Sequence, residues 1–293
     1  MTILQAIFLG LVQGLTEFIP VSSTAHLVFA ARLVNLYGGA DKTLQAEQTT
    51  ATIAVIQLGT LLAVLIYFAR DIVNITRAFI SDHIAWFRGQ TEPGQPKLSR
   101  DAWLGWLVII GSLPVGTVGL VLKKQIEGPF TKNLWVIATM MIVVGVLMMI
   151  AEIVGKRDRG MDQLRVGDAL AVGSAQVLAL IPGSSRSGST IMGGLFTGLN
   201  RETAARFSFL LSIPAIAASG LLELKEAIEK LPHGSYGSLT VATIVSGVVG
   251  YASIWFLLRY LRTHSTSLFI VYRVIVGGAI LAALAAGYVS ANI

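Results

Sequence analysis

The sequence contains no cysteine and few charged residues. Of its 293 residues, 13% are Asp, Glu, Lys or Arg, whereas 54% are hydrophobic. The lack of cysteine excludes disulfides, thiolate metal ligands and cysteine nucleophiles. The shortage of charge, with a mean hydropathy of +0.72, excludes soluble enzymes, nucleic-acid-binding proteins and disordered scaffolds, because so apolar a surface would aggregate in water. We therefore expect an integral membrane protein that crosses the bilayer several times and has no nucleic-acid partner.

Six apolar stretches are long enough to cross a bilayer, whose hydrocarbon core of about 30 Å needs about 20 residues of helix. The six stretches are 47–68, 103–122, 133–153, 203–222, 239–258 and 267–289. They predict an all-α fold with six transmembrane helices.

Two further apolar regions, 1–36 and 166–200, are each interrupted by a polar, proline-containing segment. The interruptions are 18–24 in the first region and 180–190 in the second. Each region thus has two apolar arms that are too short to span, which favours a re-entrant helix hairpin that enters and leaves on one face.

The order of elements repeats: a hairpin and three spans are followed by a second hairpin and three spans. The sequence QGLTEFIPVSS at 13–23 also resembles QVLALIPGSS at 176–185. We therefore expect one membrane domain over 1–293, with repeat halves at about 1–153 and 166–293. Because three spans is an odd number, the second half should be inverted, and the two hairpin tips should meet near the bilayer midplane, where such proteins bind substrates.

Lys and Arg are unevenly distributed between the two sets of loops. The loops at 69–102, 154–165 and 259–266 hold eleven of them, and the segments on the other side hold seven. The positive-inside rule then predicts that these three loops are cytoplasmic and that both termini lie outside. The net charge of +6 fits loops beside anionic lipid.

The second interruption has the composition of an anion-binding site. Residues 182–190 contain four serines, a threonine, two glycines and Arg186. Glycines allow close backbone approach, free amides at a helix N-terminus and hydroxyls donate hydrogen bonds, and arginine binds phosphate with two donors. An arginine at membrane depth is costly, so helix packing alone does not explain it. We expect phosphate or diphosphate as the ligand.

The first interruption supplies complementary groups. Glu17 could hold a divalent cation or act as a base, Ser22 and Ser23 offer hydroxyls, and His26 can give or take a proton. Together the two tips contain an acid/base pair, nucleophiles and an anion clamp, which are the groups needed for phosphoryl transfer. The residues leave open whether Ser23 or His26 attacks phosphorus.

Other polar residues in the apolar stretches have simpler explanations. Arg206 and Arg273 are expected either to reach the interface or to pair with a buried acid. Four isolated serines are interpreted as helix-packing residues: Ser174, Ser208, Ser212 and Ser246. Three histidines are predicted to be solvated in loops: His83, His233 and His264.

The segments Gln13–His26 and Pro182–Thr190 together resemble the signature segments of bacterial undecaprenyl-diphosphate phosphatases of the bacitracin-resistance type. The resemblance extends over essentially the whole chain, including Phe207–Pro214. In that family the first motif is an acid or amide, three residues, then glutamate, which falls on Gln13 and Glu17 here.

This resemblance implies an inverted-repeat fold in the bacterial cytoplasmic membrane, a pocket open to the extracytoplasmic side, and a divalent cation, Mg²⁺ or Ca²⁺, at Glu17 with Gln13 beside it. It also implies a set of residues that line the diphosphate pocket: Ser23, His26, Ser185, Arg186, Ser187 and Thr190. Ser22 and Gly183, from the same two segments, are further expected substrate-binding residues.

Two function classes remain in competition. The first is a membrane hydrolase that converts undecaprenyl diphosphate to undecaprenyl phosphate and phosphate, which recycles the lipid carrier for peptidoglycan synthesis and confers bacitracin resistance. The second is a lipid-phosphate transporter, since carriers also place broken helices at the midplane. Glu17, Ser23 and His26 within ten residues favour chemistry, because a carrier needs no nucleophile. A purely structural oligomer would not need Arg186 at depth, and a homodimer of the enzyme is left open.

Overall fold

A computed structural model describes residues 1–38, 42–90, 97–126, 133–231 and 235–291, without the side chains of 42–43, 219 and 221–230. The described residues form helices and no β-strand. In chain order the first half contains α1 (Ile3–Phe18), α2 (Ser23–Leu33), α3 (Lys42–Tyr67), α4 (Ala69–Phe87), α5 (Arg100–Val121), α6 (Lys123–Ile126) and α7 (Leu134–Val154). The second half contains α8 (Val166–Val177), α9 (Arg186–Phe196), α10 (Arg201–Lys230), α11 (Tyr236–Leu261) and α12 (Ser267–Ala285), with short 3₁₀ turns at Met161–Gln163 and Leu178–Leu180.

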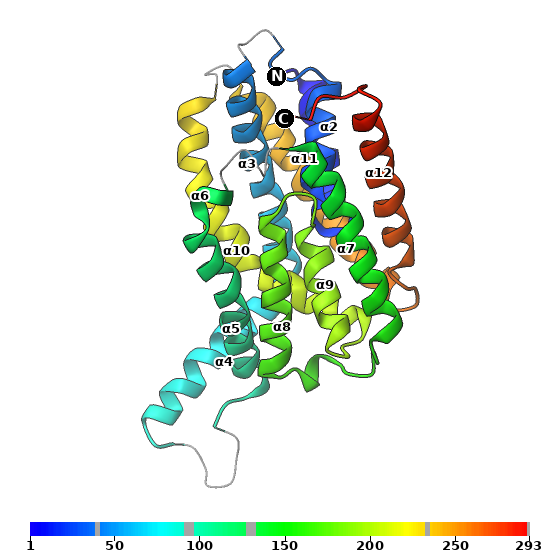
Figure 1. Ribbon diagram of the computed structural model, residues 1–293. Coiled ribbons are helices and arrows are strands. Elements are labelled where there is room, and N and C mark those ends of the chain that lie inside the picture. The colour runs from blue at the N-terminus through cyan, green and yellow to red at the C-terminus, as the bar shows by residue number, and fades with distance from the viewer. Residues whose placement is uncertain (39–41, 91–96, 127–132, 232–234, 292–293) are drawn as a thin grey trace.

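Five helices are long and apolar enough to cross a membrane, which confirms five of the six predicted spans. They are Leu44–Tyr67 within α3, α5, α7, α11 and α12. The sixth predicted span, 203–222, lies within α10, part of which has no described side chains. These helices run along the long axis of the molecule (Figure 1), as expected of a multi-pass membrane protein.

The two interrupted regions are broken by the same local device. A residue that precedes proline avoids the helical region of backbone conformation. Ile19, before Pro20, has φ −66° and ψ 133°, and ends α1. Ile181, before Pro182, has φ −95° and ψ 118°, and ends the 3₁₀ turn that extends α8. The prolines therefore fix where each apolar region breaks.

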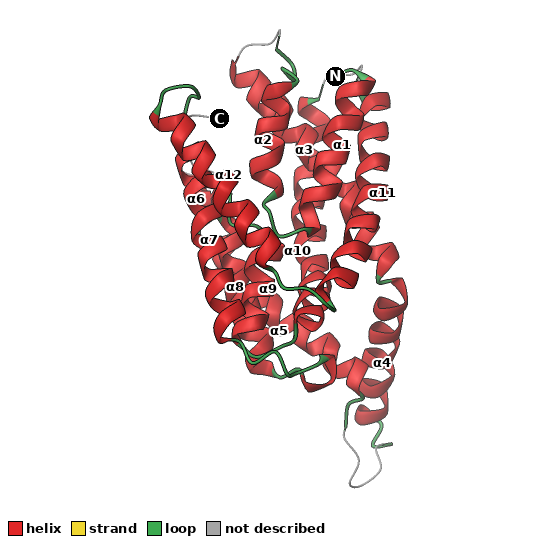
Figure 2. Cartoon of the chain, turned by 90° about the vertical axis from the view of Figure 1, so that its right-hand side faces the viewer, coloured by secondary structure: helices red, strands yellow, loops and turns green. Residues whose placement is uncertain are grey.

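The two pairs of short helices lie at opposite ends of the bundle. Figure 2 shows α1 and α2 side by side at the end that holds the termini, and α8 and α9 together nearer the other end, where α4 also lies. Both pairs turn in the middle of the molecule. The breaks at 19–22 and 181–185 thus face each other inside the bundle.

Close backbone approach at glycines fixes the position of each hairpin against a span of the other half. A Cβ added to Gly10 of α1 would lie 2.5 Å from the carbonyl oxygen of Ala242 in α11. A Cβ added to Gly173 of α8 would lie 2.1 Å from the carbonyl oxygen of Gly111 in α5. Ser246 of α11 donates a hydrogen bond to the carbonyl oxygen of Ile56 in α3, so it joins two packed helices, as its predicted packing role requires.

Residues 69–87 form a helix, whereas the sequence analysis assigned 69–102 to a cytoplasmic loop. The segment alternates polar and apolar residues and has no buried residue, so hydropathy alone did not reveal it. His83 is therefore helical and not solvated: it accepts a hydrogen bond from Trp106 Nε1 at 3.0 Å, and its Nδ1 contacts the carbonyl oxygen of Phe79 at 2.6 Å.

Candidate active site

An ion pair joins the two hairpin tips. Arg186, at the start of α9, donates a hydrogen bond of 2.5 Å to Glu17 Oε1, at the end of α1. The Glu17 side chain is 7% exposed and that of Arg186 is 16% exposed. The two residues are 169 positions apart in the chain, so the contact exists only because the breaks meet inside the bundle. Loss of either side chain would leave the other charge buried and unpaired, which is costly.

Gln13 is the second group that holds Glu17. It lies one helical turn earlier on α1, and its Nε2 donates to Glu17 Oε2 at 3.1 Å and contacts Thr60 Oγ1 of α3 at 3.4 Å. Gln13 is 1% exposed, and its Oε1 has no hydrogen-bond partner among the described residues. A buried acceptor without a donor is costly, so this oxygen is available to a cation or another donor.

Some hydroxyls of the second tip are hydrogen-bonded, whereas those of Ser184 and Ser189 are buried without a partner among the described residues. Ser185 Oγ caps α9 by accepting from the amide of Gly188 at 3.2 Å, and it lies 3.2 Å from Ser187 Oγ. Thr190 Oγ1 donates to the carbonyl oxygen of Arg186 at 2.7 Å and lies 2.5 Å from Ser208 Oγ of α10. Ser208 therefore supports this tip, whereas the sequence analysis interpreted it only as a helix-packing residue.

Equivalent serines in the two tips have unusual backbone conformations. Ser22, the residue before α2, has φ 77° and ψ 94°. Ser185, the residue before α9, has φ 67° and ψ 118°. Non-glycine residues at positive φ cost about 1–3 kcal/mol each and cluster at functional sites. Each strained serine directs the next residues into a helix whose N-terminus, with its unpaired amides, lies at the break.

His26 and Ser23 lie on α2, three residues apart and hence on neighbouring positions of one helix face. His26 Nδ1 lies 2.7 Å from the carbonyl oxygen of Ser22, which can only accept, so Nδ1 carries the proton. Nε2 then accepts from the hydroxyl of Tyr272 at 2.6 Å, and the two rings stack. The Ser23 hydroxyl forms no hydrogen bond with the part of the chain that the structure describes. Nothing in the apolar stretch at 267–289 marks Tyr272 as a site residue.

Arg273 binds both tips, contrary to the expectation that it would reach the interface or pair with an acid. Its side chain on α12 is fully buried. It donates hydrogen bonds only to main-chain carbonyl oxygens, and these are Pro20 in the first tip, Gly183 and Ser184 in the second, and Met140 and Met141 in α7. The chain reversals at the breaks leave carbonyls without helical partners, and a guanidinium with five donors satisfies several at once.

Gly183 fits closely against α7. It has φ +94°, and an added Cβ would lie 2.2 Å from the carbonyl oxygen of Ile137. The close approach that this glycine allows is therefore to another helix. Its expected contact with substrate stays a prediction.

The charges of the tips favour an anion. Glu17 neutralises Arg186, and Arg273 adds a second buried positive charge that no carboxylate neutralises among the described residues. Two helix N-termini add partial positive charge at the breaks. A phosphate that replaced Glu17 on Arg186 would lie near Arg273 and the two helix N-termini, all of which favour negative charge.

The first tip has two oxygen-bearing side chains, Glu17 and Gln13, that a hard divalent cation could use together with phosphate oxygens. The described residues contain no group of three or more His, Cys, Asp or Glu side chains suited to a metal ion. However, Mg²⁺ is often held by one or two carboxylates together with substrate phosphates. Glu17 provides one carboxylate, and the unpaired Oε1 of Gln13 provides a neutral oxygen.

These features define a class of protein: a multi-pass helical membrane protein with a buried arginine–glutamate pair where two broken helix pairs meet. The sequence matches the family described as Bacitracin resistance protein BacA over residues 6–279. The chain belongs to this family.

Its relatives carry a common name. It is 52% identical to the undecaprenyl-diphosphatase of Syntrophobacter fumaroxidans over 281 residues, which are 96% of this chain and 97% of the relative. It is 46% identical to the undecaprenyl-diphosphatase of Mycolicibacterium vanbaalenii over 294 residues, covering 99% and 100% of the two chains. The undecaprenyl-diphosphatase of Chloroherpeton thalassium is 48% identical over 301 residues, with coverage of 99% and 100%.

Proposed function

We propose that this protein is a membrane phosphatase that hydrolyses undecaprenyl diphosphate to undecaprenyl phosphate and phosphate. Near-full-length relatives with that name support the reaction. The observation that carries the proposal is the Arg186–Glu17 pair between the two breaks. It places an arginine that can bind phosphate beside a carboxylate. The product would return to peptidoglycan synthesis, and faster recycling would confer resistance to bacitracin, in keeping with the family description.

Arg186 exchanges partners in this proposal. The diphosphate replaces Glu17 on the guanidinium, and the N-terminal amides of α2 and α9 bind the remaining phosphate oxygens. The hydroxyls of Ser185, Ser187 and Thr190 hold the start of α9 in place. Preorganised donors of this kind supply most of the catalysis in phosphoryl transfer.

The arrangement on α2 favours Ser23 as the nucleophile and His26 as the base. Ser23 has a hydroxyl without a protein hydrogen bond among the described residues, and Nε2 of His26, the unprotonated nitrogen of that ring, takes its proton after the Tyr272 hydroxyl turns away from it. Ser23 Oγ bonds to the terminal phosphorus, its proton passes to His26, and the bond to the bridging oxygen breaks to release undecaprenyl phosphate. Water then hydrolyses the phosphoserine and releases phosphate.

A divalent cation, Mg²⁺ or Ca²⁺, completes the site in this proposal. Glu17 and Gln13 Oε1 would hold it together with the diphosphate. When bound, the cation would neutralise charge that develops on the phosphate oxygens. Glu17, released from Arg186 by the substrate, gains a positive partner in exchange.

The proposed membrane arrangement has six transmembrane helices and two re-entrant hairpins in an inverted repeat. Helices in equivalent places of the two halves make equivalent contacts, which supports this arrangement. The first helix of each hairpin packs against a span of the other half: α1 against α11, and α8 against α5. In the same way, α3 packs against α11 and α10 packs against α5. Pairs that occupy the same place in both halves, α3 with α10 and α7 with α12, pack against each other. Such reciprocity is typical of a pseudo-two-fold axis.

We place the protein in the bacterial cytoplasmic membrane with both termini outside, on the basis of the Lys and Arg distribution. The end of the bundle with α1 and α2 then faces outward, and the site opens to the extracytoplasmic side between these helices and α12. Substrate released on that face would reach the site from the outer leaflet.

The reaction is tested with purified protein in detergent and undecaprenyl diphosphate. We expect phosphate release that stops with chelator and resumes with Mg²⁺ or Ca²⁺. A lipid-phosphate transporter, the alternative from the sequence, would bind the diphosphate and release no phosphate. No described contact favours that alternative, and the names of the relatives do not support it.

A further inference from the structure

Helix α4 carries two adjacent exposed stripes of different chemistry. Val73, Ile80, Ile84 and Phe87 are 43%, 54%, 45% and 82% exposed, and their spacings of seven, four and three residues place them on one face. We call these four residues the apolar stripe.

An arginine row lies beside the apolar stripe. The row consists of Arg70, Arg77 and Arg88, all of which are exposed. With 100° of rotation per residue, these arginines lie roughly 60° from the apolar stripe around the helix axis. In the part of the chain that the structure describes, none of the three forms an ion pair. An apolar stripe edged by arginines is typical of a helix that lies at a membrane surface.

The acidic residues of α4 lie on the other side of the helix and have partners. Asp71 pairs with Arg206 of α10 at 2.9 Å. Asp82 accepts from the amide of Ser99 at 2.6 Å, and hydrogen bonds from Ser99 hold the pKa of Asp82 below its ordinary value. Both carboxylates therefore have partners outside the arginine row.

The face of α4 that carries Phe79 and His83, distinct from the apolar stripe, is fixed to the bundle. Phe79 packs at a tilt against Trp106 of α5, with ring centroids 5.4 Å apart, and His83 accepts a hydrogen bond from the same tryptophan. This docking sets the rotation of α4 about its axis. The apolar stripe is consequently held outward and cannot turn inward to bury itself.

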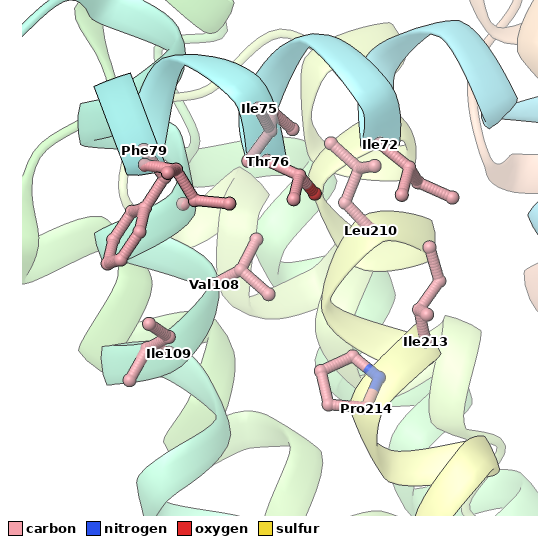
Figure 3. Close-up of a pocket in the computed structure, with 11 residues that line it drawn as sticks. Ile72, Ile75, Thr76, Phe79, Val108, Ile109, Leu210, Ile213 and Pro214 are labelled. Atoms are coloured by element: carbon pink, nitrogen blue, oxygen red, sulfur yellow. The ribbon is translucent and has the colours of Figure 1, made fainter. Parts of the chain in front are cut away.

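An apolar cavity opens beside the stripe. Figure 3 shows Ile72, Ile75 and Phe79 of α4 facing Val108 of α5 and Pro214 of α10 across it. The cavity has a volume of about 340 Å³. It continues along α5 into a second hollow of about 600 Å³ that shares Val108, Ile109 and Pro214. This elongated apolar groove has the chemistry and shape that suit a hydrocarbon chain.

We propose that α4 binds anionic phospholipid of the adjacent leaflet: the arginine row binds the phosphate headgroups, the apolar stripe enters the acyl region, and one acyl chain occupies the groove between α4, α5 and α10. A second copy of this chain suits the surface less well. In a two-fold interface the same surface meets itself, so stripe-to-stripe contact would bring two arginine rows together. The proposal is independent of the phosphatase reaction, because it involves no residue of the tips.

The first test measures where the stripe lies. The cysteine-free chain allows single nitroxide labels at Ile84→Cys in the stripe and Ser81→Cys on the polar side, in vesicles of phosphatidylethanolamine and phosphatidylglycerol. We expect the Ile84 label to collide more with oxygen than with a water-soluble nickel complex, and the Ser81 label to do the reverse. A water-exposed Ile84 label, or one shielded from both reagents with spin–spin coupling between copies, would overturn the proposal.

The second test measures the headgroup preference. A bimane label at Ile84→Cys is quenched by brominated phosphatidylglycerol or brominated phosphatidylcholine. We expect phosphatidylglycerol to be preferred on the order of tenfold, and the triple variant Arg70→Gln, Arg77→Gln, Arg88→Gln to lose that preference. The matched control removes three exposed positive charges at the same end: Lys156→Gln, Arg165→Gln and Arg259→Gln.

The control should keep the preference, because none of its three charges lies on α4. Equal loss in the control would mean that net charge alone attracts the lipid, and no preference in the parent protein would mean that α4 does not select headgroups. Either result overturns the proposal. Phosphate release is not a readout here, so a failure of the proposed reaction would leave these measurements valid.

Discussion

The two hairpin tips have matching backbones and different side chains. Both break at an Ile-Pro step, both resume after a serine at positive φ, and both give a carbonyl to Arg273. In the second tip, Ser185 caps its helix and lies beside Ser187, whereas the buried hydroxyls of Ser184 and Ser189 have no hydrogen-bond partner among the described residues. In the first tip, Ser22 forms no side-chain cap, and Ser23 is left without a hydrogen bond among the described residues.

This difference indicates a division of roles. A tip with an arginine and a capped helix start is prepared to hold an anion, because these donors are already in place when the ligand arrives. A tip with unbonded hydroxyls next to a histidine and a carboxylate is prepared to react. A repeated backbone thus supplies the frame twice, and side-chain substitution makes one copy a binding element and the other a reactive one.

The largest effect is expected when the nucleophile of the first tip is removed, which tests whether that tip is the reactive one. We expect Ser23→Ala to lower the rate of phosphate release on the order of 10⁴-fold, since loss of a nucleophile removes the covalent route. The measurement is turnover of undecaprenyl diphosphate by purified protein. Ser174→Ala, an exposed serine on α8, should have no effect. A Ser23→Ala rate within tenfold of the parent would transfer the nucleophilic role to His26.

Loss of Arg273 should damage both tips together. In Arg273→Met the carbonyls of Pro20, Gly183 and Ser184 lose a buried donor, which leaves acceptors without partners. We expect a loss of about 4 kcal/mol in the free energy of unfolding, measured by denaturant titration in detergent. Arg259→Met, at an exposed position, should change it by less than about 0.5 kcal/mol. Unchanged stability of Arg273→Met would show that the tips do not depend on this arginine.

Arg186→Lys tests the second tip alone. The substitution keeps the charge, but an ammonium cannot grip two phosphate oxygens with a planar fork. The expected loss is about 3 kcal/mol of transition-state stabilisation, or roughly a hundredfold in rate, with folding retained. Arg259→Lys is the matched control and should be silent. Near-normal turnover of Arg186→Lys would leave the anion-clamp interpretation without support.

The smallest expected effect concerns the cation at the first tip. Gln13→Glu adds a second carboxylate beside Glu17, and the number of charged ligands tunes affinity for hard cations. We expect the Mg²⁺ or Ca²⁺ concentration for half-maximal rate to fall by about tenfold. Glu17→Gln should be inactive at low cation and partly rescued by excess. Full activity of the parent protein in excess chelator would assign Glu17 to proton transfer instead.

Much of the site could be predicted from the sequence because its residues violate the apolar pattern. Glu17 and Arg186 lie in apolar regions where a charge is costly, and each stands next to a proline and serines that break a helix. Tyr272 could not be found in this way, since a tyrosine in an apolar helix is unremarkable. The role of Ser208 was missed for the same reason: a serine in a membrane helix usually reflects packing.

The local sequence shows which segments are apolar, where Pro20 and Pro182 interrupt them, and which charges lie at membrane depth. These features depend on composition and on steric effects between adjacent residues. The partners of the buried charges and the orientation of α4, in contrast, depend on how the helices pack. Arg273 binds carbonyls, Glu17 binds Arg186, and α4 turns its apolar stripe outward, because each choice depends on helices that are distant in the chain and meet only when the bundle packs.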